Sequence, residues 1–185
     1  MDKKRTNKSS KVVLYIATSM DGFIARPNGK LDWLENLPTT ENTDYGYADF
    51  LKSVGTIVMG KTTYNEILGF GIDWPYPDHK TYVVSSNQSF LPTTPETYLL
   101  NTDIDVFITK LKEESDQNCW LVGGGKLINY FLNKDLIDKM IVSIAPVILG
   151  EGIPLFAGKS MESEWNLDTI EKFDNCIVSL TYTKK

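Results

Sequence analysis

The stretch Trp120-Leu-Val-Gly-Gly-Gly-Lys-Leu-Ile-Asn-Tyr-Phe-Leu132 decides how the rest of the chain is interpreted. An apolar run breaks at three glycines and resumes with helical spacing, which is typical of a strand that leads into a helix. Glycine lets a ligand approach the backbone closely, and the first N–H groups of a helix attract anions. The stretch therefore indicates a site for a nucleotide pyrophosphate. A tight loop that uses glycine for its geometry alone is the alternative.

Comparable apolar runs and helical patterns alternate along the chain. The patterns predict strands over 12–17, 56–59, 80–85, 97–100, 119–122, 139–145, 164–173 and 176–183, and helices over 43–53, 61–68, 104–114 and 126–133. Such alternation predicts a mixed, mostly parallel sheet with helices on both faces. The last three strands have no helices between them, which predicts antiparallel strands at the C-terminal edge. Residues 19–42 form the longest irregular stretch, a length that usually has a function.

The length of 185 residues fits one domain, predicted over 12–185, after a disordered basic tail over 1–11. Without that tail, 14 basic and 23 acidic side chains leave a net charge of −9. An acidic surface argues against nucleic acid as a partner. It also requires that any phosphate be held by local N–H groups and a few placed cations.

Two cysteines, Cys119 and Cys176, and a single histidine, His79, cannot assemble a zinc site, so no metal is expected. No apolar run approaches the roughly 20 residues of a membrane span. The first residues also lack the apolar core of an export signal. These features predict a cytoplasmic protein with no membrane partner and with reduced cysteines.

A second strand-to-helix junction lies at Gly55-Thr-Ile-Val-Met-Gly60-Lys61-Thr62, which matches the phosphate-loop pattern of nucleoside triphosphatases. That loop needs its four middle residues to curl around phosphates. Here 56–59 are β-formers that predict a buried strand, so the match is interpreted as accidental. What remains is a turn at Gly60, with Lys61, Thr62 and Thr63 opening a helix, and these groups suit a phosphate.

A third junction, Thr81-Tyr-Val-Val-Ser85-Ser86-Asn87, ends a strand in hydroxyl side chains that face the ligand crevice of open α/β sheets. The three junctions, in this order, resemble the dihydrofolate reductase-like fold, and the resemblance covers nearly everything after residue 11. Two further stretches, Ser19-Met-Asp-Gly-Phe-Ile-Ala25 and Ala145-Pro-Val-Ile-Leu-Gly-Glu-Gly152, resemble the reductase domain of riboflavin biosynthesis, which is the C-terminal domain of RibD.

This resemblance implies a three-layer fold, and it implies an NADPH-dependent oxidoreductase that transfers hydride to a small-molecule substrate. In that family the substrate is 5-amino-6-(5-phosphoribosylamino)uracil, and the domains are often homodimers. The zinc ligands of the deaminase half of the bifunctional riboflavin protein are missing from this sequence. Dihydrofolate reductase proper and a non-catalytic NADPH-binding protein remain alternatives.

The family's cofactor site transfers to residues that match its motifs. The resemblance implies that the cofactor contacts Ala17, Gly60, Lys61, Thr62, Thr63, Ser85, Ser86, Gly123, Gly124, Gly125 and Lys126. Among these, Lys61, Thr62 and Thr63 would contact cofactor phosphates, and Ser85 and Ser86 would lie near the 2′-phosphate. In this fold the peptide bond between Gly123 and Gly124 is expected to be cis.

The catalytic and substrate residues have weaker support in the sequence. Asp21, in the Ser-Met-Asp-Gly turn, is the preferred catalytic contact, although aspartate before glycine is also an ordinary turn residue. Dihydrofolate reductases place an acid after the first long loop, where this chain offers Asp44 and Asp49, and Asp44 is the second catalytic candidate. Trp33 and Tyr47 are the candidates for binding substrate, with a place in the core as the alternative for each.

Overall fold

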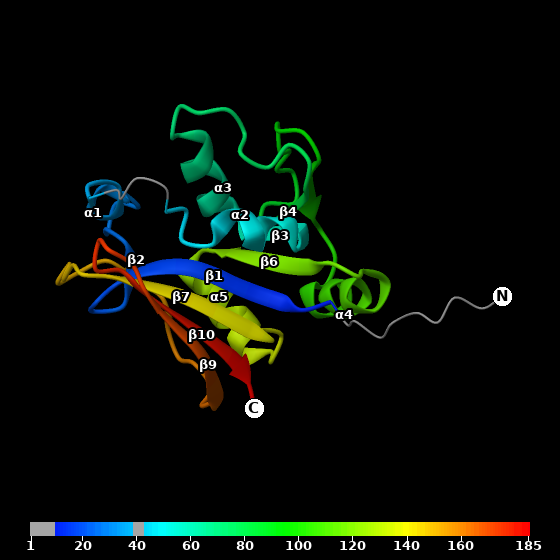
Figure 1. The fold of residues 1–185 in the computed structure, drawn as a ribbon. Helices are drawn as coiled ribbons and strands as arrows, with labels where there is room; N and C mark the ends of the chain where they lie inside the picture. The colour runs from blue at the N-terminus through cyan, green and yellow to red at the C-terminus, as the bar shows by residue number, and fades with distance from the viewer. Residues whose placement is uncertain (1–9, 39–42) are drawn as a thin grey trace.

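Eight strands form one central sheet in the order β5-β4-β3-β6-β1-β7-β10-β9 (Figure 1). The structure is a computed structural model that describes residues 10–38 and 43–185. The strands of this sheet are β1 (Val12–Ser19), β3 (Val54–Gly60), β4 (Lys80–Val84), β5 (Thr97–Leu100), β6 (Asn118–Gly123), β7 (Lys139–Ala145), β9 (Trp165–Lys172) and β10 (Val178–Lys184). Two short strands, β2 (Phe23–Ala25) and β8 (Ile153–Pro154), pair with each other outside it.

Six strands, from β5 to β7 in the sheet order, run parallel, whereas β10 is antiparallel to both β7 and β9. The predicted mixed, mostly parallel sheet with an antiparallel C-terminal strand pair is therefore confirmed. The parallel strands end along a single edge of the sheet, here called the carboxyl edge. In open α/β sheets, ligands bind at this edge.

The helices are α1 (Asp32–Glu35), α2 (Tyr47–Lys52), α3 (Lys61–Leu68), α4 (Ile104–Glu114) and α5 (Gly125–Asn133). Alternate residues of β1 belong to two separate cores, because successive side chains of a strand point to opposite faces. Val12 and Leu14 pack with residues of α4 and α5, whereas Val13 packs with residues of α2 and α3. The helices thus cover both faces of the sheet, as the three-layer arrangement predicts (Figure 1).

The predicted helix over 43–53 is shorter in the structure. It begins only at Tyr47, because Gly46 has a φ of +78° and the left-handed backbone there is incompatible with a helix. The irregular stretch over 19–42 contains two elements that the sequence does not predict, β2 and α1, while residues 39–42 lie outside the described residues. β2 forms by pairing with β8, which is distant in sequence, and no local sequence pattern predicts such a contact.

The end of the predicted basic tail is part of the folded structure. Ser10 Oγ donates a hydrogen bond to the carbonyl of Gln117 at 2.7 Å, and the N–H of Lys11 donates to Asn118 Oδ1 at 3.2 Å. Residues 1–9, the rest of that predicted tail, lie outside the described residues. Among the helices of the described ranges, none has the length and apolar character needed to cross a bilayer.

Candidate functional site

The junction of β3 and α3 is formed by a buried strand that ends at Gly60 and a helix that starts at once with Lys61. Residues 54–60 are extended and pair with both β4 and β6, so they cannot form a phosphate-binding loop. This confirms that the phosphate-loop match is accidental. Among the described residues no side chain caps the N-terminus of α3, which leaves its first N–H groups suited to an anion.

The junction of β6 and α5 is the glycine run itself. Gly123 and Gly124 have φ values of +149° and +95°, in the region that L side chains rarely adopt. The N–H groups of Leu127 and Ile128 both donate to the carbonyl of Gly124, at 2.8 and 3.0 Å. The N-terminus of α5 likewise has no side-chain cap from the part of the chain that the structure describes. Gly125 is required for packing, since a Cβ there would lie 2.7 Å from the carbonyl oxygen of Pro154.

The expected cis peptide bond between Gly123 and Gly124 is not present. Over the described residues every peptide bond is trans. The chain turns instead by combining the positive φ values of these two glycines, a route that is open to residues without a Cβ.

These two junctions contact each other at the carboxyl edge. A Cβ on Gly124 would lie 3.3 Å from Thr63 Oγ1, and one on Gly60 would lie 3.9 Å from the carbonyl oxygen of Gly123. Gly123 also lies beside the end of β1, because a Cβ there would be 3.6 Å from Ile16 Cδ1. The structure thus brings together most of the residues predicted to contact the cofactor, with Ala17 next along β1. We call these two junctions the cofactor side.

Ser85 and Ser86 directly follow β4, whose last residue, Val84, pairs with Gly60. They therefore extend the cofactor side along the same edge. The Ser85 hydroxyl is already engaged, since it accepts a hydrogen bond from the N–H of Asn87 at 3.1 Å. Lys61 lies nearby without an acidic partner among the ion pairs of the described residues.

Asp21 joins two loops at the carboxyl edge. Its carboxylate accepts hydrogen bonds from Ser19 Oγ at 2.7 Å, from the N–H of Gly150 at 2.7 Å and from the N–H of Leu149 at 3.1 Å. The Ser19 hydroxyl and then these backbone donors lower the pKa of Asp21 below its usual value. The group is therefore ionised at neutral pH and has no proton to donate there.

Asp44 has a similar local role at the start of α2. Its carboxylate accepts from the N–H of Ala48 at 2.8 Å and from the N–H of Gly46 at 3.0 Å, and these bonds lower its pKa. The neighbouring Asp49 bonds Lys52 at 2.8 Å on the surface. Both acids considered for a dihydrofolate reductase role thus already have protein partners.

The two candidate substrate residues lie in different clusters. Tyr47 packs with the core between α2 and the sheet, and its ring lies 5.9 Å from that of Trp120. Trp33 is buried in a third cluster beside Ala145 and Ile177, and its indole N–H has no hydrogen-bond partner among the described residues. An unpaired buried donor is costly in a folded protein.

Tyr45 connects the Trp33 cluster to the C-terminal hairpin. It has a positive φ of 57°, its hydroxyl accepts from Asn175 Nδ2, and its ring lies 5.0 Å from that of Phe173. Its carbonyl accepts from the hydroxyl of Tyr15 at 3.1 Å. We call the loops that meet here the substrate side; they are residues 19–38, 43–46, 147–150 and 173–177. The sequence does not predict the contact of Asn175 with Tyr45, because the context Asp174-Asn175 is that of an ordinary turn.

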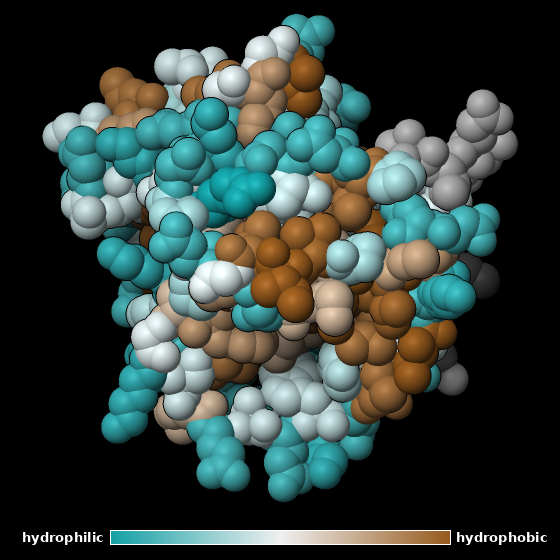
Figure 2. Space-filling model, turned by 90° about the vertical axis from the view of Figure 1, so that its left-hand side faces the viewer, coloured by the Kyte–Doolittle hydropathy of each residue, from teal (hydrophilic) through white to brown (hydrophobic). Residues whose placement is uncertain are grey.

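Figure 2 views the molecule from the side on which β2 and α1 lie, and it shows apolar surface gathered in the middle of a polar surround. Loops at this edge expose Met20 and Ile148, which are 62% and 70% accessible. The two loops are joined by a backbone hydrogen bond of 2.8 Å from Met20 N–H to the carbonyl of Val147. An apolar surface of this kind suits the planar face of a heterocycle better than a charged group.

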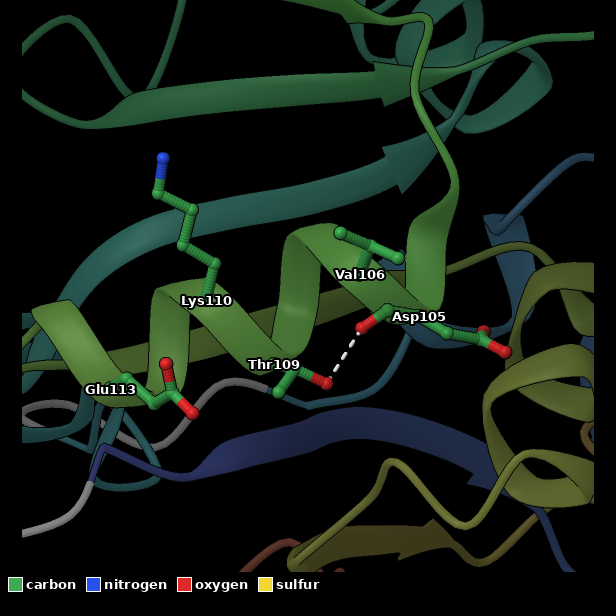
Figure 3. Close-up of a pocket in the computed structure, with 5 residues that line it drawn as sticks. All are labelled: Asp105, Val106, Thr109, Lys110 and Glu113. Atoms are coloured by element: carbon green, nitrogen blue, oxygen red, sulfur yellow. Dashed lines mark hydrogen bonds between the residues drawn. The ribbon is translucent and has the colours of Figure 1, made fainter.

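Two surface depressions lie elsewhere. One, of about 370 Å³, runs along the solvent side of α4, where Thr109 Oγ1 donates to the carbonyl of Asp105 and Val106 is exposed (Figure 3). The other, of about 410 Å³, lies between α2 and the start of β3, and His79 is among its lining residues. None of the residues predicted to bind cofactor or substrate lines either depression.

The sheet order, the uncapped glycine junctions and the antiparallel C-terminal strands define a dihydrofolate reductase-like α/β protein. The dihydrofolate reductase of Enterococcus faecalis, solved in complex with NADP(H), matches this structure with a TM-score of 0.66 over 95% of this chain and 96% of that chain. The two sequences are 15% identical, so this likeness concerns the fold alone.

The particular family is that of the RibD C-terminal domain. The chain belongs to this family, whose model matches residues 10–179. It is 35% identical over 167 residues to YwjB of Bacillus subtilis (strain 168), covering 90% of this chain and 94% of YwjB. A solved protein of Shewanella sp. PV-4, whose name refers to riboflavin biosynthesis, is 33% identical with a TM-score of 0.86, covering 95% of this chain and 99% of that chain.

Proposed function

We propose that this chain is an NADPH-dependent reductase that acts on a small heterocyclic substrate. The substrate class implied by the RibD resemblance is a ribosylamino-pyrimidine. NADPH supplies the hydride, and the protein binds and orients both reactants and excludes water. One observation carries the proposal, namely the contact between the two uncapped helix N-termini at Gly60 and at Gly124.

The cofactor side fits a phosphorylated dinucleotide for three reasons. Glycines leave the backbone of the β6–α5 junction accessible, and both helices present their positive ends to the same edge. Lys61 provides a cation that no acidic group of the described residues neutralises. Hydroxyl groups at Thr62, Thr63 and Ser86 add further donors. The preference for NADPH over NADH follows from the cation and the hydroxyls, which suit a 2′-phosphate.

On the substrate side, Asp21 and Asp44 act as ionised groups in this proposal. Asp21 holds the loop over 147–150 against the end of β1, and Asp44 holds the start of α2. Trp33, in the first long loop, and Tyr45, which follows that loop, would border the substrate from one shared cluster. Tyr47 belongs instead to the separate aromatic core beside α2.

The first test compares NADPH, NADH and magnesium ATP as ligands by thermal shift, because a ligand that binds only the folded state raises its melting temperature. NADPH is expected to give the largest shift. A shift with magnesium ATP alone would overturn the proposal. NADPH binding without oxidation, in the presence of the aminopyrimidine substrate, would favour the non-catalytic alternative.

A second test replaces the cation. Lys61→Ala is expected to weaken NADPH binding by about 1–3 kcal/mol, because one charge-assisted contact is lost. Lys110→Ala on α4 is the matched control, since it removes the same charge from an exposed position far from the cofactor side. Isothermal titration of both variants measures the difference. An equal loss in both variants would mean that only the overall charge matters.

We further propose that the enzyme is a homodimer, as the RibD resemblance implies. β9 is the last strand of the sheet, and two large apolar side chains on one of its faces, Leu167 and Ile170, are 49% and 63% accessible. An exposed apolar strand at a sheet edge favours association with another chain. Ile170→Lys is expected to give monomers in sedimentation, whereas Thr169→Lys on the opposite face is not. A monomeric wild-type chain would refute this part of the proposal.

A further inference from the structure

Lys61, the cation of the cofactor side, rests on an aromatic ring. Its Nζ lies 4.9 Å from the ring centroid of Phe90, within the range of a cation–π contact. Phe90 comes from the loop after β4, so the contact links the start of α3 to the loop that carries Ser85 and Ser86. No motif in the sequence singles out Phe90.

The Phe90 ring is itself held in place from two directions. The ring of Tyr64 packs against that of Phe90 in an edge-to-face arrangement, with 5.7 Å between the ring centroids. Tyr64 is almost fully buried, and its hydroxyl accepts from the N–H of Thr93 at 2.9 Å. Along the chain, the N–H of Phe90 donates to the carbonyl of Asn87 at 3.1 Å, which closes the turn after Ser85. The ring is thus a fixed platform rather than a free side chain.

The nature of this partner has a consequence for anion binding. A carboxylate beside Lys61 would fix the ammonium group but would also cancel its charge. An aromatic ring attracts the ammonium group through its quadrupole and leaves the full positive charge available. Holding a long, flexible side chain near its bound position also reduces the entropy lost when a ligand arrives.

We propose that Phe90 is a positioning residue that presets Lys61 for the 2′-phosphate of NADPH and so contributes to the selection of NADPH over NADH. This inference rests on the proposed function. The 2′-phosphate is the relevant group because the RibD resemblance places Ser85 and Ser86 near it. Lys61 follows β3 and the two serines follow β4, and the last residues of these strands, Gly60 and Val84, pair with each other. Lys61 and the Ser85–Ser86 pair therefore border the same stretch of the edge.

The test measures dissociation constants for NADPH and NADH in the wild-type chain, Phe90→Leu, Phe90→Tyr and Phe70→Leu. Phe90→Leu removes the ring face and is expected to weaken NADPH binding about two- to fivefold while leaving NADH unchanged. Phe90→Tyr keeps a ring and should bind NADPH as the wild type does. Phe70→Leu, at an exposed position in another loop, is the matched control and should change neither constant.

A double variant separates positioning from general packing. If Phe90 acts through Lys61, Phe90→Leu adds nothing to the loss already caused by Lys61→Ala, because interacting residues are not additive. Equal weakening of both nucleotides, or additive losses in the double variant, would overturn the inference. A wild-type chain that does not bind NADPH would instead refute the proposed function, so the two failures are distinguishable.

Discussion

The cofactor side and the substrate side lie at the same edge of the sheet, yet they are built by contacts of different range. On the cofactor side, each junction is a short motif whose glycines and first helical residues are adjacent in sequence. On the substrate side, the hydrogen bond from Gly150 to Asp21 spans 129 positions, and that from Asn175 to Tyr45 spans 130. The cofactor side is therefore specified locally, whereas the substrate side is assembled by the completed fold.

The largest expected effect tests how tightly the β6–α5 junction of the cofactor side is packed. Gly125→Ala would place a Cβ 2.7 Å from the carbonyl oxygen of Pro154 and 3.1 Å from Ala157 Cβ, so part of the backbone must move. We expect a loss of about 2–3 kcal/mol in the free energy of unfolding, as for other overpacked sites. Urea denaturation measures this loss.

Gly60→Ala is the control for that experiment. Gly60 has a φ of −75°, and the nearest atom to an added Cβ would be 3.9 Å away. This substitution should change the stability by less than about 1 kcal/mol. Equal losses at the two positions would show that the β6–α5 junction is no more tightly packed than the β3–α3 junction.

The stability of the substrate side should depend on pH through the ionisation of Asp21. The pKa of Asp21 is lower in the folded protein than its ordinary value of 3.8, first because of the Ser19 hydroxyl and then because of backbone donors. The ionised carboxylate therefore stabilises the fold above that value, and the contribution is lost as the pH falls through the lowered pKa. Asp21→Asn should reduce the melting temperature at pH 7, by less than Gly125→Ala does, and the reduction should shrink in acid.

Asp49→Asn provides the comparison for this pH experiment. Asp49 is an exposed carboxylate whose side-chain partner is Lys52, and surface pairs of this kind contribute little. Its melting curve should follow that of the wild-type chain throughout the pH range. If Asp21→Asn abolished turnover without lowering the melting temperature, the role of Asp21 in joining the loops would be refuted and the predicted catalytic role favoured.

The contrast between local and long-range contacts also explains which parts of the fold and the site the sequence predicts. The strands and helices of the sheet are predictable because β-branched runs, glycine turns and helical spacing are local signals, and most of them agree with the structure to within two residues at their ends. The residues predicted to contact the cofactor come together because most of them belong to such a signal. By contrast, β2, α1 and the Asn175–Tyr45 contact depend on segments far apart in the sequence, so no local pattern predicts them.

The smallest expected effect concerns Trp33, whose buried N–H has no partner within residues 10–38 and 43–185. Trp120 offers a matched comparison, because it is buried to the same degree, 5% against 4% accessible, but its N–H donates to the carbonyl of Tyr15 at 3.2 Å. Changing either residue to Phe removes similar volume, but only at Trp120 does the change also remove a hydrogen bond. Trp120→Phe should cost about 1 kcal/mol more than Trp33→Phe.

If the Trp33 N–H finds its acceptor in the bound substrate, Trp33→Phe should instead raise the KM of the proposed aminopyrimidine substrate, by about two- to tenfold. A structural tryptophan would show the opposite pattern, with a lower melting temperature and an unchanged KM. The N–H has no partner among the described residues, which favours the first outcome, because an unpaired buried donor is a cost that binding of a carbonyl oxygen would remove. The substrate side would then be completed by the ligand, in contrast to the preformed cofactor side.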